Sequence, residues 1–292
     1  MDKIGAMQLF RRVVEAKSFS AVSREMRLSQ STVSKKIAGL EEYLATKLLN
    51  RSTRQLNLTD AGQRYYQRCC QILDEVSDTE AELQQQQDVA TGTLRISMPI
   101  AAGRMKILPY LWEFLEQHPA LKLDVNFDDH YVDIVKEGID VAIRVGELAD
   151  STLIARKISQ IPRYTVASPA YLEEHGEPSN LESLSQHDCI VYSLLSTHNE
   201  WHFDSKKGKQ KIAVKGRFSS NSPDAICQAA LKGQGIAVIL GWLVEDDIAA
   251  GRLKVILKDY VPTTLALNAI YPQRRFMPAK LSLLLDFLQA KL

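Results

Sequence analysis

Short hydrogen-bonding and cationic side chains cluster near the start of the sequence, in SQSTVSKKIAGLEEYL (residues 29–44). Apolar residues recur there at spacings of four, three and four, as on one face of a helix: Val33, Ile37, Leu40 and Leu44. The remaining positions carry hydroxyl, amide and ammonium groups, with no acid before Glu41: Ser29, Gln30, Ser31, Thr32, Ser34, Lys35 and Lys36. An amide can pair with adenine, lysine with guanine or phosphate, and a hydroxyl with either, whereas a carboxylate would repel phosphates. The chemistry available to this face is therefore contact with double-stranded DNA.

Residues that could support catalysis or hold a metal ion are sparse. His198 and His202 are four residues apart, but neither a third ligand nor an HExxH pattern accompanies them. The GxSxG motif of many hydrolases is absent. Gly233-Gln234-Gly235 lies between a predicted helix and a predicted strand, the reverse of the dinucleotide-binding order. The sequence therefore predicts no catalytic residue, no metal site and no cofactor.

A helix-turn-helix would position the DNA-facing side chains. A first helix has an apolar stripe that includes Phe10 and Val13, and it ends at Lys17-Ser18. Ser20 is the expected N-cap of a second helix over residues 21–26. Arg27-Leu28-Ser29 then forms a turn, with Ser29 capping the next helix. In such a unit the second helix enters the major groove with its N-terminus first.

A β-wing is predicted after this unit. Leu56-Asn57-Leu58 alternates like a short strand, and two cations and two hydroxyls precede it: Arg51, Ser52, Thr53 and Arg54. The wing tip would follow phosphates or the minor groove, and the alternative is a solvated surface loop. Charge supports the DNA interpretation, since residues 1–60 hold eleven Lys or Arg against six Asp or Glu while the whole chain has a net charge of +1.

A long connector helix is expected over residues 61–87. Its seam alternates spacings of four and three: Tyr65, Cys69, Ile72, Val76, Thr79 and Leu83. Such a heptad pattern predicts pairing with a second copy of the helix, and the alternative is one amphipathic helix packed on its own domain.

The next 200 residues alternate predicted strands and helices. Strands are expected at 94–98, 121–127 and 139–145. Helices are expected over 104–117, interrupted or kinked by Pro109, and over 132–136. This βαβαβ order predicts a parallel sheet. A second series starts at 163–168, and the final strand and helix return to the first lobe. The expected fold is α/β overall, with a winged helix-turn-helix at 1–60, a linker at 61–90 and a two-lobed domain at 91–292. Lobe one would comprise about 91–161 and 266–292, and lobe two about 162–265.

These segments resemble a known family. SFSAVSREMRLSQSTVSKKIAGLEEYLATKLLNRSTRQLNLTDAG is similar to the winged helix-turn-helix of LysR-type transcriptional regulators, which typically read SFxxAAxxLxxSQSxVSxxIxxLExxLGxxLFxRxxRxxxLTxAG. The departures are Ala45, where Gly is usual, and Leu49, where Phe is usual. GTLRISMP, VDIVKEGIDVAIRVGEL and LKGQGIAVI are similar to the effector-binding domain of one large LysR subgroup. The resemblance implies a linker helix that dimerises the DNA-binding domains, and a domain like periplasmic binding proteins that holds a small molecule between its lobes.

The expected ligand site lies at the carboxyl ends of strands and near helix N-termini. One such end follows the strand residue Ser97 and runs from Met98 to Ala102, including Pro99, Ile100 and Ala101. The other is Asn221-Ser222-Pro223-Asp224, where Ser222 is a good N-cap. Ser97 is itself a candidate effector contact. Free amides favour a carboxylate-bearing effector, although Asp224 weakens that preference. Nearby Trp201 and Phe203 indicate an aromatic body. By the resemblance, Ala101, Asp128 and Asp129 line the first lobe, and Arg144 to Gly146 form the floor.

The class of the protein follows from these features together. No apolar run is long enough to span a membrane, the N-terminus meets charge too soon for a secretory signal, and the four cysteines form no CxxC pair. We therefore expect a cytoplasmic regulator, a homodimer or homotetramer, that binds promoter DNA and a small organic acid. The alternative is a solute-binding or enzymatic α/β protein with an unrelated N-terminal appendage.

Overall fold

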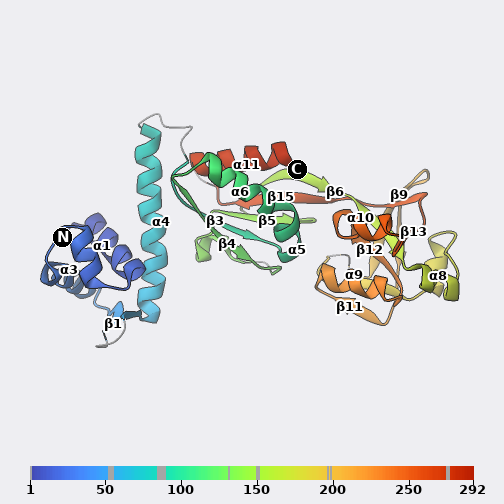
Figure 1. Cartoon of the computed structure of the whole chain (residues 1–292), viewed down its shortest axis with the longest axis horizontal. Helices are drawn as coiled ribbons and strands as arrows, with labels where there is room; N and C mark the ends of the chain where they lie inside the picture. The colour runs from blue at the N-terminus through green and yellow to red at the C-terminus, as the bar shows by residue number, and fades with distance from the viewer. Residues whose placement is uncertain are drawn as a thin grey trace.

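The structure is a computed structural model of the 292-residue chain. It describes residues 2–51, 56–83, 90–130, 132–148, 152–195, 197, 199–273 and 277–292. A small helical head, one long helix and two sheet-based lobes follow one another along the molecule (Figure 1). This arrangement agrees with the α/β class and the order of parts expected from the sequence.

The head contains three helices and a two-stranded wing: α1 (Lys3–Ala16), α2 (Phe19–Glu25), α3 (Gln30–Tyr43), β1 (Leu49–Arg51) and β2 (Leu56–Leu58). The helices share one core, in which Phe10, Val33 and Ile37 are fully buried. As predicted, Ser29 caps α3, and its hydroxyl accepts a hydrogen bond from the amide of Thr32 at 3.1 Å. The turn and its cap therefore fix where the DNA-facing helix begins.

The cap of α2 differs from the expectation. The Ser18 hydroxyl, not that of Ser20, accepts from the amide of Ala21 at 3.2 Å. Lys17 has a left-handed backbone (φ 48°), which ends α1 so sharply that Ser18 is already extended (φ −155°). Both serines suit an N-cap, and the tight reversal at Lys17 selects the earlier one.

The wing strands pair antiparallel, with Leu49 opposite Leu58, so the predicted strand at 56–58 is confirmed. The predicted phosphate-tracking residues Thr53 and Arg54 lie outside the described residues, and Arg51 is described only as part of β1.

The connector is the helix α4 (Asp60–Leu83), and the predicted continuation to residue 87 lies outside the described residues. Its heptad seam is divided between two environments. Tyr65 and Cys69 pack into the core of the head, whereas Ile72 is 38% exposed and Thr79 is also exposed. Within this chain, then, the seam serves the head at its start and stays open further along.

Lobe one is built on a sheet of order β4-β3-β5-β15-β6. Its strands are β3 (Gly92–Met98), β4 (Leu121–Phe127), β5 (Val141–Val145), β6 (Ile154–Ile161) and β15 (Leu265–Tyr271). As predicted, β3 is parallel to β4 and β5, whereas β15 runs antiparallel to β5 and β6. The helices α6 (Leu108–Gln117) and α11 (Ala279–Lys291) pack on this sheet, and the short α7 (Ile134–Glu137) precedes β5.

The helix expected from residue 104 begins earlier and is interrupted before Pro109. A short helix, α5 (Ile100–Ala102), leads into a π-helical turn over Gly103–Ile107, and Pro109 lies in the first turn of α6. Gly103 packs so closely on β3 that a Cβ there would be 2.5 Å from Met98 Cγ. The irregular turn thus lies at the carboxyl end of β3, a position where π-turns often serve binding.

Lobe two contains a five-stranded sheet of order β11-β8-β12-β7-β13 and a small sheet of order β10-β9-β14. The larger sheet comprises β7 (Arg163–Ala167), β8 (Cys189–Tyr192), β11 (Phe218–Ser220), β12 (Ile236–Leu240) and β13 (Lys254–Val255). The smaller comprises β9 (Glu200–Ser205), β10 (Gly208–Ala213) and β14 (Tyr260–Pro262). Its helices are α8 (Pro169–His175), a 3-10 turn at Glu182–Gln186, α9 (Pro223–Leu231) and α10 (Gly241–Ala249).

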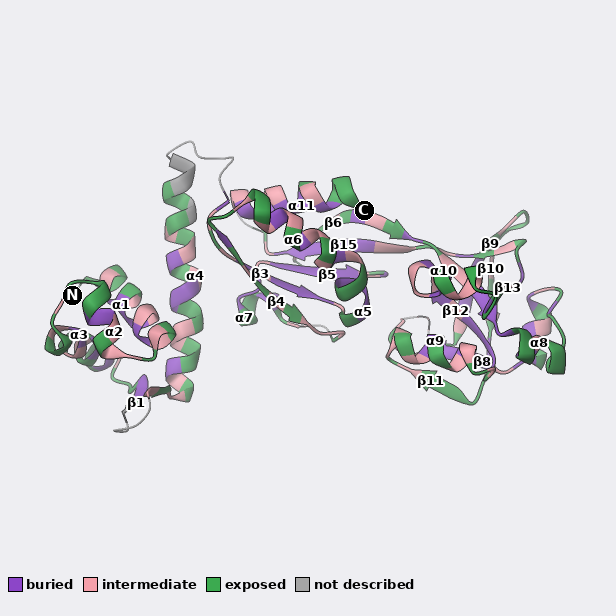
Figure 2. Ribbon diagram, viewed as in Figure 1, coloured by how far each residue is buried: buried purple, intermediate pink, exposed green. Residues whose placement is uncertain are grey.

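The chain crosses between the lobes twice, from β6 to β7 and from β14 to β15. Buried residues are concentrated within each lobe and in the head (Figure 2). All four cysteines are free and buried. In the described part of the chain, no helix is both long and apolar enough to cross a bilayer.

Candidate functional site

The polar face of α3 is open to solvent. Ser29, Gln30 and Ser31 at its start are exposed, as are Lys35 and Lys36 one turn later. Thr32 and Ser34 are partly buried between them. Neither lysine forms an ion pair with any other residue that the structure describes, so both ammonium groups are available to phosphates or bases.

Glu41, the first acid along α3, is buried away from this face. One carboxylate oxygen accepts from the amides of Leu48 at 2.9 Å and Leu49 at 3.1 Å, and the other accepts from Lys47 Nζ at 2.9 Å. Burial alone would raise the pKa of Glu41, but these three donors outweigh it and hold the pKa below its ordinary value. Glu41 therefore joins α3 to the start of the wing. The sequence signal was its position four residues after Ile37, on the apolar face.

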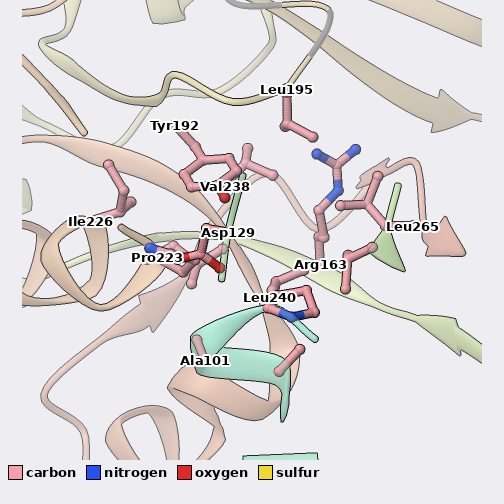
Figure 3. A pocket seen from close by; sticks show the side chains of 14 residues that line it. Ala101, Asp129, Arg163, Tyr192, Leu195, Pro223, Ile226, Val238, Leu240 and Leu265 are labelled. Carbon is pink, nitrogen blue, oxygen red and sulfur yellow. The ribbon is translucent and has the colours of Figure 1, made fainter. Parts of the chain in front are cut away.

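A second candidate site is the pocket between the lobes, called here the interlobe pocket (Figure 3). It encloses about 640 Å³ not filled by protein atoms, its open mouth included. Lobe one contributes Pro99, Ala101, Ala102, Asp129, Val145 and Leu265. Lobe two contributes Arg163, Tyr192, Leu195, Pro223, Ile226, Val238, Ile239 and Leu240. The lining is mainly apolar, with two charged groups and one phenol, which is typical of small-molecule sites.

Arg163 enters the pocket from the first crossing between the lobes. Its Nε donates to the carbonyl of Thr263 on the second crossing at 2.8 Å, and its guanidinium group lies among the pocket-lining side chains in Figure 3. Burial lowers the pKa of Arg163 to about 10, so the group is still a cation at neutral pH. Among the described residues no carboxylate pairs with it. A partly buried cation without an ion-pair partner is a strong recognition element for an anion.

Asp129 and Tyr192 supply the other polar groups, one from each lobe. The Asp129 carboxylate accepts from the amide of Ile100 at 3.0 Å, which fixes it at the start of α5. Burial raises the pKa of Tyr192 to about 12, and the negative charge of Asp129 contributes. Tyr192 is therefore a neutral hydrogen-bond donor at pH 7.

The residues predicted from the strand and helix ends reach the pocket unevenly. Pro99, Ala101 and Asp129 line it. Ile100 is 41% exposed and contributes its amide to Asp129 instead. Asn221 and Ser222 are not lining residues; Ser222 caps α9, as predicted, and the following Pro223 lines the pocket.

The predicted floor is a buried layer beneath the lining. Arg144 Nη2 donates to Ser97 Oγ at 3.0 Å, and both side chains are buried. Gly146 follows the lining residue Val145, and its carbonyl accepts from Asn268 Nδ2 at 3.1 Å. The Asp128 carboxylate accepts from the backbone and ring of His130, at 2.8 and 3.0 Å, and is not part of the lining. Ser97, Asp128 and Arg144 are thus not among the lining residues, and each is engaged within lobe one.

Trp201 and Phe203, expected to contact an effector, are not lining residues of the interlobe pocket. Both lie on β9 with side chains in the core of lobe two, where Phe203 is fully buried. Their proximity in sequence to the Asn221-Ser222 loop gave no information on which face of the small sheet packs against the core. Arg163 and Tyr192 were missed because each is the terminal residue of a strand, Arg163 the first of β7 and Tyr192 the last of β8, which is a weak signal without the fold.

No group of three or more residues able to hold a metal ion occurs in the portion of the chain that the structure covers. His202, singled out in the sequence, has its Nε2 at 2.6 Å from a Glu200 carboxylate oxygen, and His198 lies outside the described residues.

Comparison with known proteins identifies the family. Residues 4–63 match the bacterial regulatory helix-turn-helix protein, lysR family, and residues 87–292 match the LysR substrate binding domain. An uncharacterized HTH-type transcriptional regulator of Haemophilus influenzae is 34% identical over 282 residues, 97% of this chain and 98% of that protein.

Solved structures of two LysR-type regulators match nearly the whole chain. CrgA, a LysR-type transcriptional regulator from Neisseria meningitidis, is 31% identical with a TM-score of 0.60, covering 98% of this chain and 97% of that one. The Vibrio cholerae virulence activator AphB is 29% identical with a TM-score of 0.59, covering 99% and 100%. The N-terminal head is thus part of the family architecture and no unrelated appendage, and the chain belongs to the LysR family of bacterial DNA-binding transcriptional regulators.

Proposed function

We propose that this regulator binds promoter DNA through α3 and the β1–β2 wing, and that a small organic acid in the interlobe pocket modulates the binding. The observation that carries the effector class is the Arg163 cation in a mainly apolar lining, where none of the described carboxylates, Asp129 included, forms an ion pair with it. A carboxylate would supply that charge and accept hydrogen bonds from the terminal guanidinium nitrogens.

The rest of the lining restricts the ligand further. Leu195, Ile226, Val238, Leu240 and Leu265 offer apolar contact to a short hydrocarbon body. Asp129 accepts hydrogen bonds, so a hydroxyl or amino group distant from the carboxylate fits the lobe-one side. Tyr192 is the one aromatic residue of the lining, which gives an aromatic body less support than the sequence did.

Oligomerisation is part of the proposal. LysR regulators form oligomers, and the open part of the α4 seam, from Ile72 to Thr79, is available to a second copy. A homodimer or homotetramer would place two α3 helices in successive major grooves. We propose a cytoplasmic protein without a catalytic step.

The test begins by selecting genomic DNA fragments that the purified full-length protein retains. Gel shifts of a retained fragment are then repeated with a panel of hydroxy, amino and unsubstituted carboxylic acids and with their amides. We expect one acid, and not its amide, to change the apparent affinity several-fold. If no fragment is retained, the DNA assignment is overturned. If the amides change the apparent affinity to the same extent as the acids, the effector class is overturned.

Arg163→Met sharpens the test. We expect it to bind the selected DNA within about twofold of the wild type, and to bind the active acid about 10- to 100-fold more weakly because charge-assisted hydrogen bonds are lost. Arg156→Met is the matched control. Arg156 pairs with Asp286 on the surface at 2.7 Å, and its loss should leave acid affinity unchanged.

A further inference from the structure

One carboxylate on the linker helix joins the head to the effector-binding domain of the same chain. Asp74 Oδ1 lies 3.1 Å from Nη1 of Arg11, which stands on α1. Asp74 Oδ2 lies 2.9 Å from Nη1 of Arg95, which stands on β3. The two oxygens of a single side chain thus hold cations from two different domains.

This bridge is sheltered from solvent. The side chains of Asp74, Arg11 and Arg95 are 13%, 25% and 21% exposed. Neighbouring Cys70, one turn earlier on α4, is buried, and its thiol lies close enough to both arginines for their charge to lower its pKa, against the larger effect of burial. Partial burial weakens solvent screening, so this bridge is worth more than an exposed ion pair.

Around the bridge, the linker helix α4 packs closely against the effector-binding domain. Asp140 Oδ2 accepts from the amide of Arg95 at 2.9 Å, and the Asp140 amide donates to the Arg95 carbonyl at 2.9 Å. Gly138 has a left-handed backbone (φ 72°), and a Cβ there would lie 2.2 Å from Gln71 Nε2 of α4. A glycine therefore lets the linker helix approach lobe one at this point.

Ion pairs elsewhere in the head lack this arrangement. Arg12 and Glu25 form a pair at 2.8 Å, with side chains 40% and 47% exposed, and both residues belong to the head. An exposed pair within one domain contributes little and constrains no domain angle. The Asp74 bridge differs in burial and in joining three elements: α1, α4 and β3.

We propose that Asp74 is a positioning residue for DNA recognition: by holding Arg11 and Arg95 together it fixes the orientation of the head relative to the effector-binding domain. In an oligomer this orientation sets the separation and angle of two α3 helices. A fixed geometry raises the effective concentration of the second head at its half-site and penalises wrong half-site spacing.

Strand β3 also connects the bridge to the interlobe pocket. Arg95 stands in its middle, and Pro99, which follows its end, lines the pocket. This part of the inference rests on the proposed effector function: if effector binding shifts the pocket lining at Pro99, the bridge would transmit the shift through β3 to the head. The spacing test below needs no effector, so it stands or falls separately from that function.

The test compares full-length Asp74→Asn with wild type on a duplex taken from the genomic selection, on the same duplex with two base pairs inserted at its centre, and on a single half-site. We expect wild type to lose at least tenfold in affinity on the insertion, and Asp74→Asn less than about threefold. On the original duplex Asp74→Asn should bind about tenfold more weakly, with half-site affinity within twofold of wild type.

Two further variants separate positioning from loss of folding. Arg95→Met breaks the contact with the effector-binding domain and leaves Arg11 of the head paired with Asp74 of the linker helix. It should reproduce the relaxed spacing, and the double variant should be no worse than either single one. Glu25→Gln, which breaks the exposed pair, should leave spacing preference unchanged. The proposal is overturned if Arg95→Met keeps the wild-type spacing preference, or if half-site affinity falls as much as affinity for the whole duplex.

Discussion

The polar face of α3 and the interlobe pocket both offer charged groups to a ligand. They differ in how exposed these groups are and in how far apart in sequence the contributing residues lie. On α3 the candidate contacts fall within eight consecutive residues, and five of them are exposed. In the pocket the polar groups come from positions 129, 163 and 192, and both lobes enclose them. An extended polyanion needs an open face with several weak contacts, whereas a small molecule needs a few desolvated ones.

The comparison also shows how each region treats its charges. On the head, Lys35 and Lys36 are exposed, and in the proposed DNA complex each would add one salt-dependent attraction among several. In the pocket, Arg163 is desolvated, and its one described hydrogen bond goes to a neutral carbonyl. The first arrangement tolerates the loss of one group, and the second does not.

The largest expected effect is a loss of stability, and it tests whether Phe203 belongs to the core of lobe two or to the pocket. Phe203→Ala should destabilise the protein by about 3–5 kcal/mol, since it empties a fully buried site in the core of lobe two. Thermal and urea unfolding of the full chain measure this loss. The milder Phe203→Leu should stay folded and bind the effector like wild type. If its effector affinity fell as far as that of Arg163→Met, Phe203 would have to be part of the ligand site.

Charge reversal on the open face comes next. Lys35→Glu should weaken binding to a selected fragment about 100-fold at physiological salt, because a carboxylate there meets phosphates. Gel shifts over a range of salt concentrations should also give a shallower slope. Lys206→Glu, on an exposed position between β9 and β10, is the matched control and should change neither quantity. Intact binding by Lys35→Glu would show that α3 does not carry the DNA contact.

Glu41 tests whether the head depends on any buried charge. Because the pKa of Glu41 is lower in the folded chain, the unfolded chain binds more protons in acid. The contribution of Glu41 to the free energy of unfolding is therefore fully present above the ordinary glutamate pKa, about 4.3. It is lost as the pH falls through the pKa of Glu41 in the folded chain. Glu41→Gln should cost about 1–3 kcal/mol at neutral pH and flatten the acid side of the stability profile.

Urea unfolding at a series of pH values measures this contribution. The neighbouring exposed Glu42→Gln is the control and should leave the profile unchanged. A Glu41→Gln variant as stable as wild type at pH 7 would mean that the wing is held by its strand pairing alone.

The smallest effect concerns the cap of α2. Ser18→Ala should cost about 1 kcal/mol, since it removes the acceptor for the Ala21 amide, whereas Ser20→Ala should stay within about 0.5 kcal/mol. Paired unfolding curves distinguish the two. Equal losses would indicate that the serine hydroxyls, which lie 3.0 Å apart, share the cap.

The sequence determined the head almost completely, because its signals are local. Periodicity at Val33 and Ile37, the cap at Ser29 and the alternation at 56–58 depend on neighbours within one or two turns, and each appears in the structure as predicted. The same holds for the βαβαβ order of lobe one and for the return of β15 and α11. Where two local signals were equivalent, as at Ser18 and Ser20, the backbone reversal at Lys17 chose between them.

Only the tertiary structure decided which side chains meet between the lobes and between the domains. Arg163 is held at the pocket by a hydrogen bond from its side chain to the carbonyl of Thr263, 100 residues away on the other crossing segment. Trp201 and Phe203 turn into a core because of the way the small sheet packs. Asp74 meets Arg11 and Arg95 across 63 and 21 residues. Contacts of this kind arise from long-range packing, which no periodicity within a segment records.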